Sequence, residues 1–319
     1  MIQSIAQPWM WALFIAFVLG MLLLDAIALG GNRAREPSIR EAALWSTLWI
    51  SLALLFDLGL WLYVADGAGR EVANARAMEF LAGYVIEKSL SVDNVFVFML
   101  IFGHFAVPVQ YQRKVLLYGV LGAIVMRIAM ILGGVWVVAE FSWMLYVFGA
   151  FLLVTGWRML KTAEQEPDLN ANPVLRWARK LFPLTDELHG ARFSVFENGK
   201  RMFTPLLLVL VLIEVSDVIF AADSIPAIFA ITTDPFIVFT SNIFAIMGLR
   251  ALYFLLAGMA RRFHLLKYGL AIVLMFVGGK MLLAKWLHIP TAGALLVIAA
   301  LLGASVAASL YVARSKALR

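Results

Sequence analysis

Two apolar segments of the sequence carry the same spacing of acidic residues. The first has Glu87 six residues before Asp93, and the second has Asp217 six residues before Asp223, with Glu214 one helical turn upstream. Insertion scales put the cost of a charged residue at the bilayer centre at about 2.5–3.5 kcal/mol, so five carboxylates in lipid need partners, protons or a cation. Their presence predicts an ion or proton site within the membrane.

Helix geometry indicates how these acids would be arranged. Each pair is followed by a small polar residue, which is Asn94 in the first segment and Ser224 in the second. At about 100° per residue, Glu87 shares a stripe with Asn94, while the second aspartate of each pair lies about 120° away. Asp217 shares a stripe with Ser224 in the same way. Because Pro226 removes a backbone hydrogen bond, we expect an unwound turn there that lets the acids of both segments converge.

An oxygen-rich site of this kind favours hard divalent cations. Carboxylates without sulfur or imidazole ligands suit Mg²⁺, Ca²⁺ or Mn²⁺ rather than Zn²⁺ or copper. The sequence has no cysteine, and its four histidines fall in predicted loops or at helix ends. Disulfides and thiol redox catalysis are therefore excluded, and no nucleotide-binding or Ser/His/Asp motif is present. We expect no enzyme and no organic cofactor.

Other intramembrane polar residues have more than one interpretation. Arg127 and Arg250 could neutralise the acids when no metal is bound, or gate access to them, or they could extend to the cytoplasmic interface. Lys88 is either a counter-charge or a headgroup contact. Asp25 is either an accessory ligand or proton relay, or a structural acid near a helix end, and Asn242 is a further accessory polar candidate.

The composition identifies a polytopic membrane protein. Of the 319 residues, 63% are hydrophobic and 14% are charged, and the mean hydropathy is +0.90, which leaves too few polar side chains for a globular surface. Nine apolar stretches are near the roughly 20 residues that a helix needs to cross the bilayer core. We expect these transmembrane helices at residues 8–30, 40–65, 77–101, 114–139, 142–160, 203–230, 235–258, 265–285 and 291–313.

The placement of the basic residues predicts the topology. With the N-terminus outside, the inner segments hold 18 of the 26 lysines and arginines, and the outer segments hold three. The positive-inside rule therefore favours an N-out, C-in arrangement. The net charge of +6 reflects this topology rather than nucleic-acid binding. The large inner segment 161–202 is expected to form a basic amphipathic helix and a hairpin that contact anionic lipids, and no protein partner follows from the sequence.

The acid pattern recurs after three helices, which indicates an inverted repeat. An odd number of spans turns the second copy upside down, and such repeats place the substrate site at their interface near mid-membrane. An arginine in the next span of each half, Arg127 and Arg250, supports the correspondence. We therefore predict a single all-α transmembrane transporter domain with an inverted three-plus-three repeat, helices 3–5 and 6–8. Its parts are two accessory helices in 1–76, the first repeat in 77–160, the basic loop in 161–202, the second repeat in 203–285, and a ninth helix with its tail in 286–319.

Three segments of the sequence resemble the TerC family of bacterial membrane proteins. They are residues 83–96, 214–229 and 240–250, and the resemblance extends over nearly the full length. It implies a nine-helix inner-membrane protein with a site for a divalent metal. It also implies manganese export, as in some members, and an older association with tellurium resistance and redox modulation. The family's acidic metal-site residues carry over to Glu87, Asp93, Glu214, Asp217 and Asp223.

We therefore expect a multi-pass secondary transporter of the bacterial inner membrane that exports Mn²⁺ through the intramembrane acids. Moving a dication out against an inside-negative potential costs about 2.3 kcal/mol per charge per 100 mV, so exchange for protons is physically reasonable. A second hypothesis is a non-transporting metal-binding scaffold, or a modulator of redox state or tellurium resistance. The basic loop favours this second hypothesis, and the inverted repeat disfavours it. A membrane redox enzyme would need a haem, quinone or thiol site that these residues do not supply.

Overall fold

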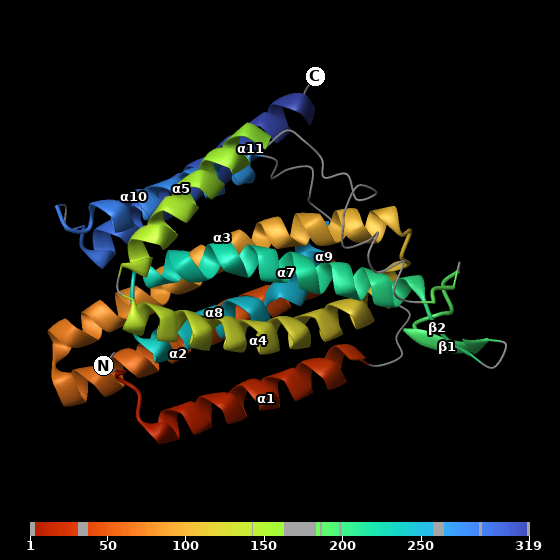
Figure 1. Cartoon of the computed structure of the whole chain (residues 1–319), viewed down its shortest axis with the longest axis horizontal. Helices are drawn as coiled ribbons and strands as arrows, with labels where there is room; N and C mark the ends of the chain where they lie inside the picture. Colours follow the sequence, from red (N-terminus) through yellow and green to blue (C-terminus); the bar gives the residue numbers. More distant parts are fainter. Residues whose placement is uncertain are drawn as a thin grey trace.

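The computed structural model describes residues 4–30, 38–141, 143–162, 183–185, 187–197, 200–257, 265–286 and 289–317. In this part of the chain every predicted span is helical, and the helices form an elongated bundle (Figure 1). The elements are α1 (Pro8–Gly30), α2 (Ile39–Ala68), α3 (Arg70–His104), α4 (Val109–Glu140), α5 (Met144–Thr162), β1 (Ser194–Glu197), β2 (Lys200–Phe203), α7 (Pro205–Phe229), α8 (Pro235–Met247), α9 (Leu249–Ala257), α10 (Leu266–Leu283) and α11 (Thr291–Ala317).

The lengths and surfaces of the helices fit a membrane protein. Seven helical segments among the described residues are long and apolar enough to cross a bilayer. α3 is longer still, at 35 residues, but it carries Glu87, Lys88 and Asp93. Large apolar side chains such as Leu13 on α1 and Trp136 on α4 are exposed, which is typical of surfaces that face lipid.

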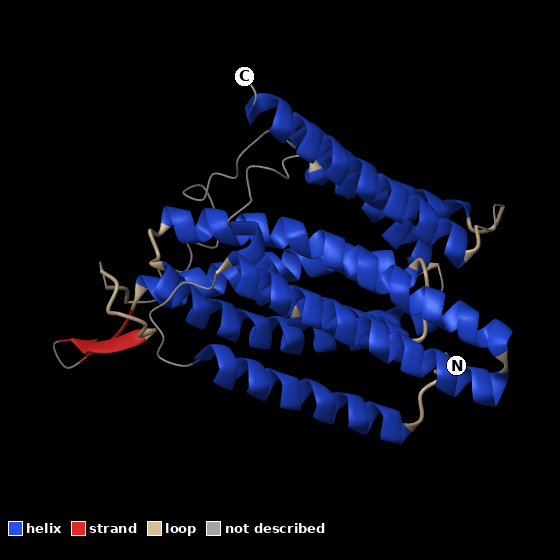
Figure 2. Ribbon diagram, turned by 180° about the vertical axis from the view of Figure 1, so that it is seen from behind, coloured by secondary structure: helices blue, strands red, loops and turns tan. Residues whose placement is uncertain are grey.

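The helices are arranged in a main bundle and a flanking layer. The main bundle contains α2, α3, α4, α7, α8 and α9, with α1 along one edge, and α5, α10 and α11 form a tilted layer at the opposite edge (Figure 1 and Figure 2). Glycines bring α5 and α10 into backbone contact: a Cβ atom on Gly278 would lie 2.6 Å from the carbonyl oxygen of Gly149. Small residues at such contacts allow close helix packing in lipid.

Local sequence signals set several helix ends. Gly69 joins α2 directly to α3 with a φ of 89°, a conformation that glycine adopts without strain. Pro205 and Pro235 occupy the first turns of α7 and α8, where the missing N–H has no helical partner to lose. Asp234 caps α8 by accepting a hydrogen bond of 2.9 Å from the backbone N–H of Phe236.

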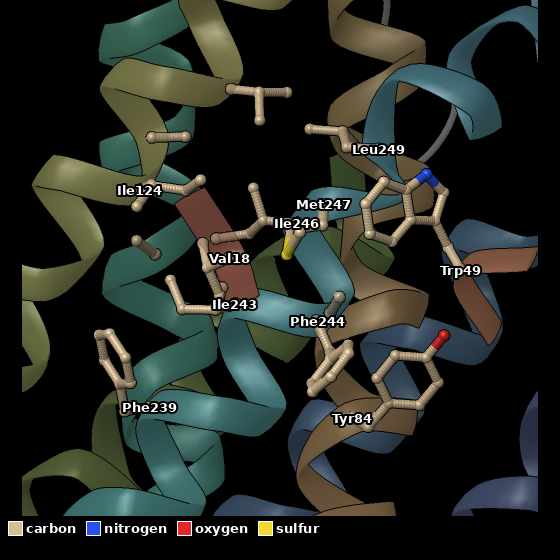
Figure 3. Packing of buried hydrophobic residues seen from close by; sticks show 14 of the residues in the cluster. Val18, Trp49, Tyr84, Ile124, Phe239, Ile243, Phe244, Ile246, Met247 and Leu249 are labelled. Carbon is tan, nitrogen blue, oxygen red and sulfur yellow. The ribbon is translucent and has the colours of Figure 1, made fainter. Parts of the chain in front are cut away.

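The centre of the main bundle is α8. Every residue from Phe236 to Met247 is buried, and most of them are apolar, as expected for a helix with neighbours on all sides. Figure 3 shows the apolar packing around it, with Trp49 and Tyr84 on one side and Ile124 on the other. Any polar side chain on α8 is therefore held in the interior of the protein.

Two helices differ from the sequence-based expectation. The span expected at 235–258 is divided at Gly248 into α8 and α9. Conversely, α7 continues through Pro226 to Phe229, so the unwound turn expected beside Asp223 is absent and that prediction is wrong. Pro226 lies in the last turn of α7, where it removes one internal hydrogen bond just before the helix ends in any case.

The helix directions are those that an inverted repeat requires. α3 runs antiparallel to α7, and α5 runs antiparallel to α10 (Figure 1). α3 packs along α8, and α4 packs along α7, which are the two pairs that an inversion would exchange. The repeat itself, its boundaries and the N-out orientation stay predictions.

The large inner segment is described only at its C-terminal end. Strands β1 and β2 pair antiparallel, with Val195 opposite Met202, as expected for the hairpin. The turn residues 198–199 and the predicted amphipathic helix at 172–181 lie outside the described residues. Contact of this segment with anionic lipids therefore stays a prediction.

Candidate functional site

The first acid of each repeated pair is buried at the centre of the main bundle. Glu87 on α3 is 0% exposed, and Asp217 on α7 is 2% exposed. Asn94 and Ser224, which share their stripes, are buried too, and the Nδ2 of Asn94 donates to Oδ1 of Asp217 at 3.4 Å. The helical periodicity correctly placed each of these acids on the same stripe as its small polar neighbour, but it did not indicate which stripe faces the interior.

Arg127 on α4 joins these two acids. Its Nε and Nη2 donate to the two carboxylate oxygens of Asp217 at 3.3 and 3.2 Å, which is the bidentate geometry that favours arginine. Its Nη1 donates to Oε1 of Glu87 and, at 3.2 Å each, to Oγ of Ser224 and Oδ1 of Asn242. With 1% exposure, Arg127 neutralises the acids and does not extend to the interface.

Asn242 completes this network from α8. Its Oδ1 accepts from Arg127, and its Nδ2 donates to Oε2 of Glu87 at 3.0 Å. The side chain of Asn242 therefore contacts both charged groups, the guanidinium of Arg127 through its oxygen and the carboxylate of Glu87 through its nitrogen. It does so from a helix that is buried on all sides. Two carboxylates and one guanidinium carry one negative charge in excess when all are ionised, and the neighbouring Lys88, which interacts electrostatically with Glu87, can offset it.

The second aspartates of the repeated pairs face the flanking layer. Asp93 lies near Lys267 on α10 and interacts with it electrostatically, and Asp223 lies near Thr155 on α5. The inversion that relates α3 to α7 would also relate α10 to α5, so the two aspartates occupy corresponding places. The sequence did not indicate Lys267 or Thr155, because the third helix of each predicted repeat shows little similarity to the other.

Glu214 lies one turn before Asp217, at the contact between α7 and α4. A Cβ atom on Gly122 would overlap the carboxyl group of Glu214, so the glycine makes room for that group. Oε2 of Glu214 is buried and has no hydrogen-bond partner among the described residues. Acids three residues apart on a helix repel each other when both are ionised. Binding of a proton or a cation to Glu214 would relieve its repulsion by Asp217.

The five acids do not form one ligand set in this structure. Within the described ranges, no group of three or more histidine, aspartate or glutamate residues lies close enough together to hold a metal ion. The expectation that all five converge is therefore not met, because an unbroken α7 keeps Asp223 about 120° from the stripe of Asp217. The arrangement is instead a central pair bridged by Arg127, with three further carboxylates on neighbouring turns.

The remaining accessory candidates take separate places. Nζ of Lys88 donates to the carbonyl oxygen of Ala245 at 3.2 Å. A Cβ atom on Gly248 would lie 2.5 Å from this Nζ atom. Lys88 thus satisfies a carbonyl group at the end of α8, which explains why the helix can break at Gly248. Arg250 is buried in α9, with 4% exposure, and the side chain of Asp25 lies outside the described residues.

Membrane-length helices around a buried charge network define a multi-pass integral membrane protein. The chain belongs to the integral membrane protein TerC family, which matches residues 72–317 and confirms the resemblance seen in the sequence.

Three relatives illustrate this membership. The chain is 52% identical over 315 residues to the "Putative membrane-bound redox modulator Alx" of Photorhabdus laumondii, which covers 99% of this chain and 98% of that protein. The protein of the same name from Escherichia coli K12 is 51% identical over 296 residues, or 93% of this chain and 92% of the relative. An uncharacterized membrane protein of Myxococcus xanthus is 47% identical over 311 residues, or 98% and 95% of the two chains. No solved structure matches the chain.

Proposed function

We propose that this protein is a secondary transporter of the bacterial inner membrane that exports Mn²⁺ from the cytoplasm. The observation that supports this proposal most directly is the meeting of Glu87 and Asp217 in the middle of the bundle, each fully removed from the surface. Buried intramembrane carboxylates of this kind mark ion and proton pathways. A dication that bridges the two helices would neutralise both charges at once.

The packing of the helices suggests how access to such a site could alternate. Glu87 and Asn242 belong to the pair α3–α8, whereas Arg127 and Asp217 belong to the pair α4–α7. If the two pairs are related by inversion, rocking of one against the other would open the site to each side in turn. The site lies at the boundary between the pairs, where such a motion would change its accessibility most.

The chemistry of the donors supports a hard divalent cation. Carboxylate and amide oxygens surround the centre, and these are ligands for Mg²⁺, Ca²⁺ and Mn²⁺. We choose manganese among the three because the resemblance of this sequence to the TerC family implies manganese export. The names of the relatives refer to a redox modulator, but redox chemistry through cysteine thiols is excluded because the sequence contains no cysteine.

Protons are the coupling ions in this proposal. Glu214 has a buried carboxylate oxygen without a hydrogen-bond partner among the described residues, so it can carry a proton at low cost. Asp93 and Asp223 lie at the flanking layer and could pass protons to and from the centre. Each proton that enters recovers part of the electrical work of exporting a dication.

Mn²⁺ flux in proteoliposomes that contain only this purified protein tests the proposal. Glu87→Gln at the centre should abolish flux, and so should Asp93→Asn and Asp223→Asn at the flanking layer, whereas Asp66→Asn, at an exposed position on α2, should leave it at the wild-type rate. Full flux in Glu87→Gln would reject the assignment of the central site, and full flux in both flanking variants would reject their part in proton transfer. Wild-type protein that binds Mn²⁺ but does not move it would support the scaffold hypothesis instead.

A further inference from the structure

We infer that Arg127 is a tethered competitor of the transported cation. Its Nη1 group lies between Glu87 and Asn242, where a dication that used Glu87 as a ligand would have to bind. The inference rests on the proposed function, because it concerns the order of events at the same site. It adds that the guanidinium leaves Glu87 when the dication arrives and returns when the dication departs.

The two sides of the guanidinium have different partners. Nε and Nη2 bind Asp217 in a bidentate pair within the α4–α7 unit. Nη1 reaches across to the α3–α8 unit, where it meets Glu87 and Asn242, and it also donates to Ser224 of α7 at 3.2 Å. Among the described residues, the contacts of Arg127 with Glu87 and Asn242 are the ones that connect the two units through this side chain, so the cation can replace them without removing Arg127 from Asp217 and Ser224.

A displaced guanidinium in the membrane interior still needs acceptors. Asp217 holds it throughout, and Glu214 lies on the same helix one turn away, with a carboxylate oxygen that has no partner among the described residues. A shift of Arg127 toward Glu214 keeps every positive charge next to a carboxylate. This shift also frees Glu87 for the metal and gives Glu214 a function beside Asp217.

Binding of Mn²⁺ to Arg127 variants measures the competition. Arg127→Gln removes the competing charge, so the dissociation constant for Mn²⁺ in detergent should fall at least about tenfold, or 1.4 kcal/mol. Mn²⁺ flux in proteoliposomes should fall in the same variant, because nothing then displaces the bound ion. Lys285→Gln removes one positive charge from an exposed position, and its affinity and flux should equal those of the wild type.

A second variant keeps the test decisive if Arg127→Gln does not fold. Arg127→Lys retains the charge but cannot bind Asp217 and Glu87 together through a planar fork. Its affinity for Mn²⁺ should therefore rise at least about threefold. Equal or weaker binding in the folded variants, with normal export by the wild type, overturns this inference and leaves the proposed function intact. Wild-type protein that neither binds nor moves Mn²⁺ overturns both.

Discussion

Substitution of Gly122 by alanine should separate the role of Glu214 from the folding of the protein. Gly122 lies in the middle of α4, and the added methyl group would come within 2.5 Å of Oε2 of Glu214. Contacts shorter than 3.0 Å are essentially never seen for real Cβ atoms, so one of the two groups must move. The carboxyl group is the end of a flexible side chain, and it will move in preference to the backbone of α4.

The size of the effect follows from this displacement. An ordinary van der Waals contact is about 3.5 Å, and Oε1 of Glu214 lies even closer to the added methyl group than Oε2, so the carboxyl group must shift by more than about 1 Å. A shift of that size in a reacting group can reduce a rate by about a hundredfold. Alanine is favoured over glycine inside a helix by about 1 kcal/mol, so the substitution should not impair folding of α4. We therefore expect Mn²⁺ flux through Gly122→Ala to fall by about ten- to a hundredfold.

The assay is initial-rate Mn²⁺ uptake by proteoliposomes loaded with a fluorescent chelator, with equal amounts of each variant reconstituted. Gly133→Ala on the same helix is the matched control, because its added methyl group would meet no atom within 4 Å. The control should transport at the wild-type rate and unfold at a similar temperature. If Gly122→Ala transports as fast as Gly133→Ala, the position of Glu214 has no bearing on transport and the reasoning is refuted.

Three other substitutions probe contacts around the site. Gly248→Ala should push Lys88 off its carbonyl acceptor and lower the unfolding free energy by about 1 kcal/mol, seen as a lower thermal midpoint in detergent. Asp234→Ala removes the cap of α8 and the 2.8 Å hydrogen bond from the N–H of Ile5, so it should destabilise by about 1–2 kcal/mol and speed amide exchange at Ile5. Asp217→Asn replaces the bidentate charge pair with neutral hydrogen bonding while Glu87 still pairs with Arg127, so it should cost about 1.5–3 kcal/mol of stability.

Each of these variants has a control with the same chemistry. Gly279→Ala adds a methyl group to α10 where nothing lies within 4 Å, so it should not lower the midpoint and should raise it slightly through the helix preference of alanine. Asp234→Asn keeps a side-chain oxygen that can cap α8, so a loss equal to that of the alanine variant would contradict the capping role. Asp66→Asn changes an exposed acid, and a comparable loss there would mean that the effect of Asp217→Asn is not specific to the buried pair.

Much of the architecture follows from the sequence by simple physical rules. Apolar runs of membrane-spanning length correctly predicted where the helices of the described residues lie, and seven of those helices can cross a bilayer, because a helix in lipid satisfies its backbone polar groups along its whole length. The repeat spacing also predicted that Glu87 and Asn94 lie on one stripe, and that Asp217 lies on a stripe with Ser224. These predictions depend only on the helix period, which tertiary contacts do not alter.

Features that depend on contacts between distant helices were harder to predict. The partners of Arg127 were left open, because the sequence does not state which face of α4 meets α3 and α7. The break at Gly248 has no local signal stronger than one glycine, and the carbonyl group of Ala245 beside it is bound by Lys88 from another helix. Pro226 gave the opposite error, since a proline near the end of a helix needs no unwound turn.

The order of the chain gives the buried network a consequence for biogenesis. Arg127 is synthesised 40 residues after Glu87 and 90 residues before Asp217. While the ribosome completes the intervening segment, Glu87 is the one carboxylate partner in that network which already exists, and an unpaired arginine in hydrocarbon is costly. The nascent α3–α4 hairpin is therefore held together by a provisional ion pair at insertion. Emergence of α7 then supplies the second carboxylate and locks the two halves of the polypeptide in register.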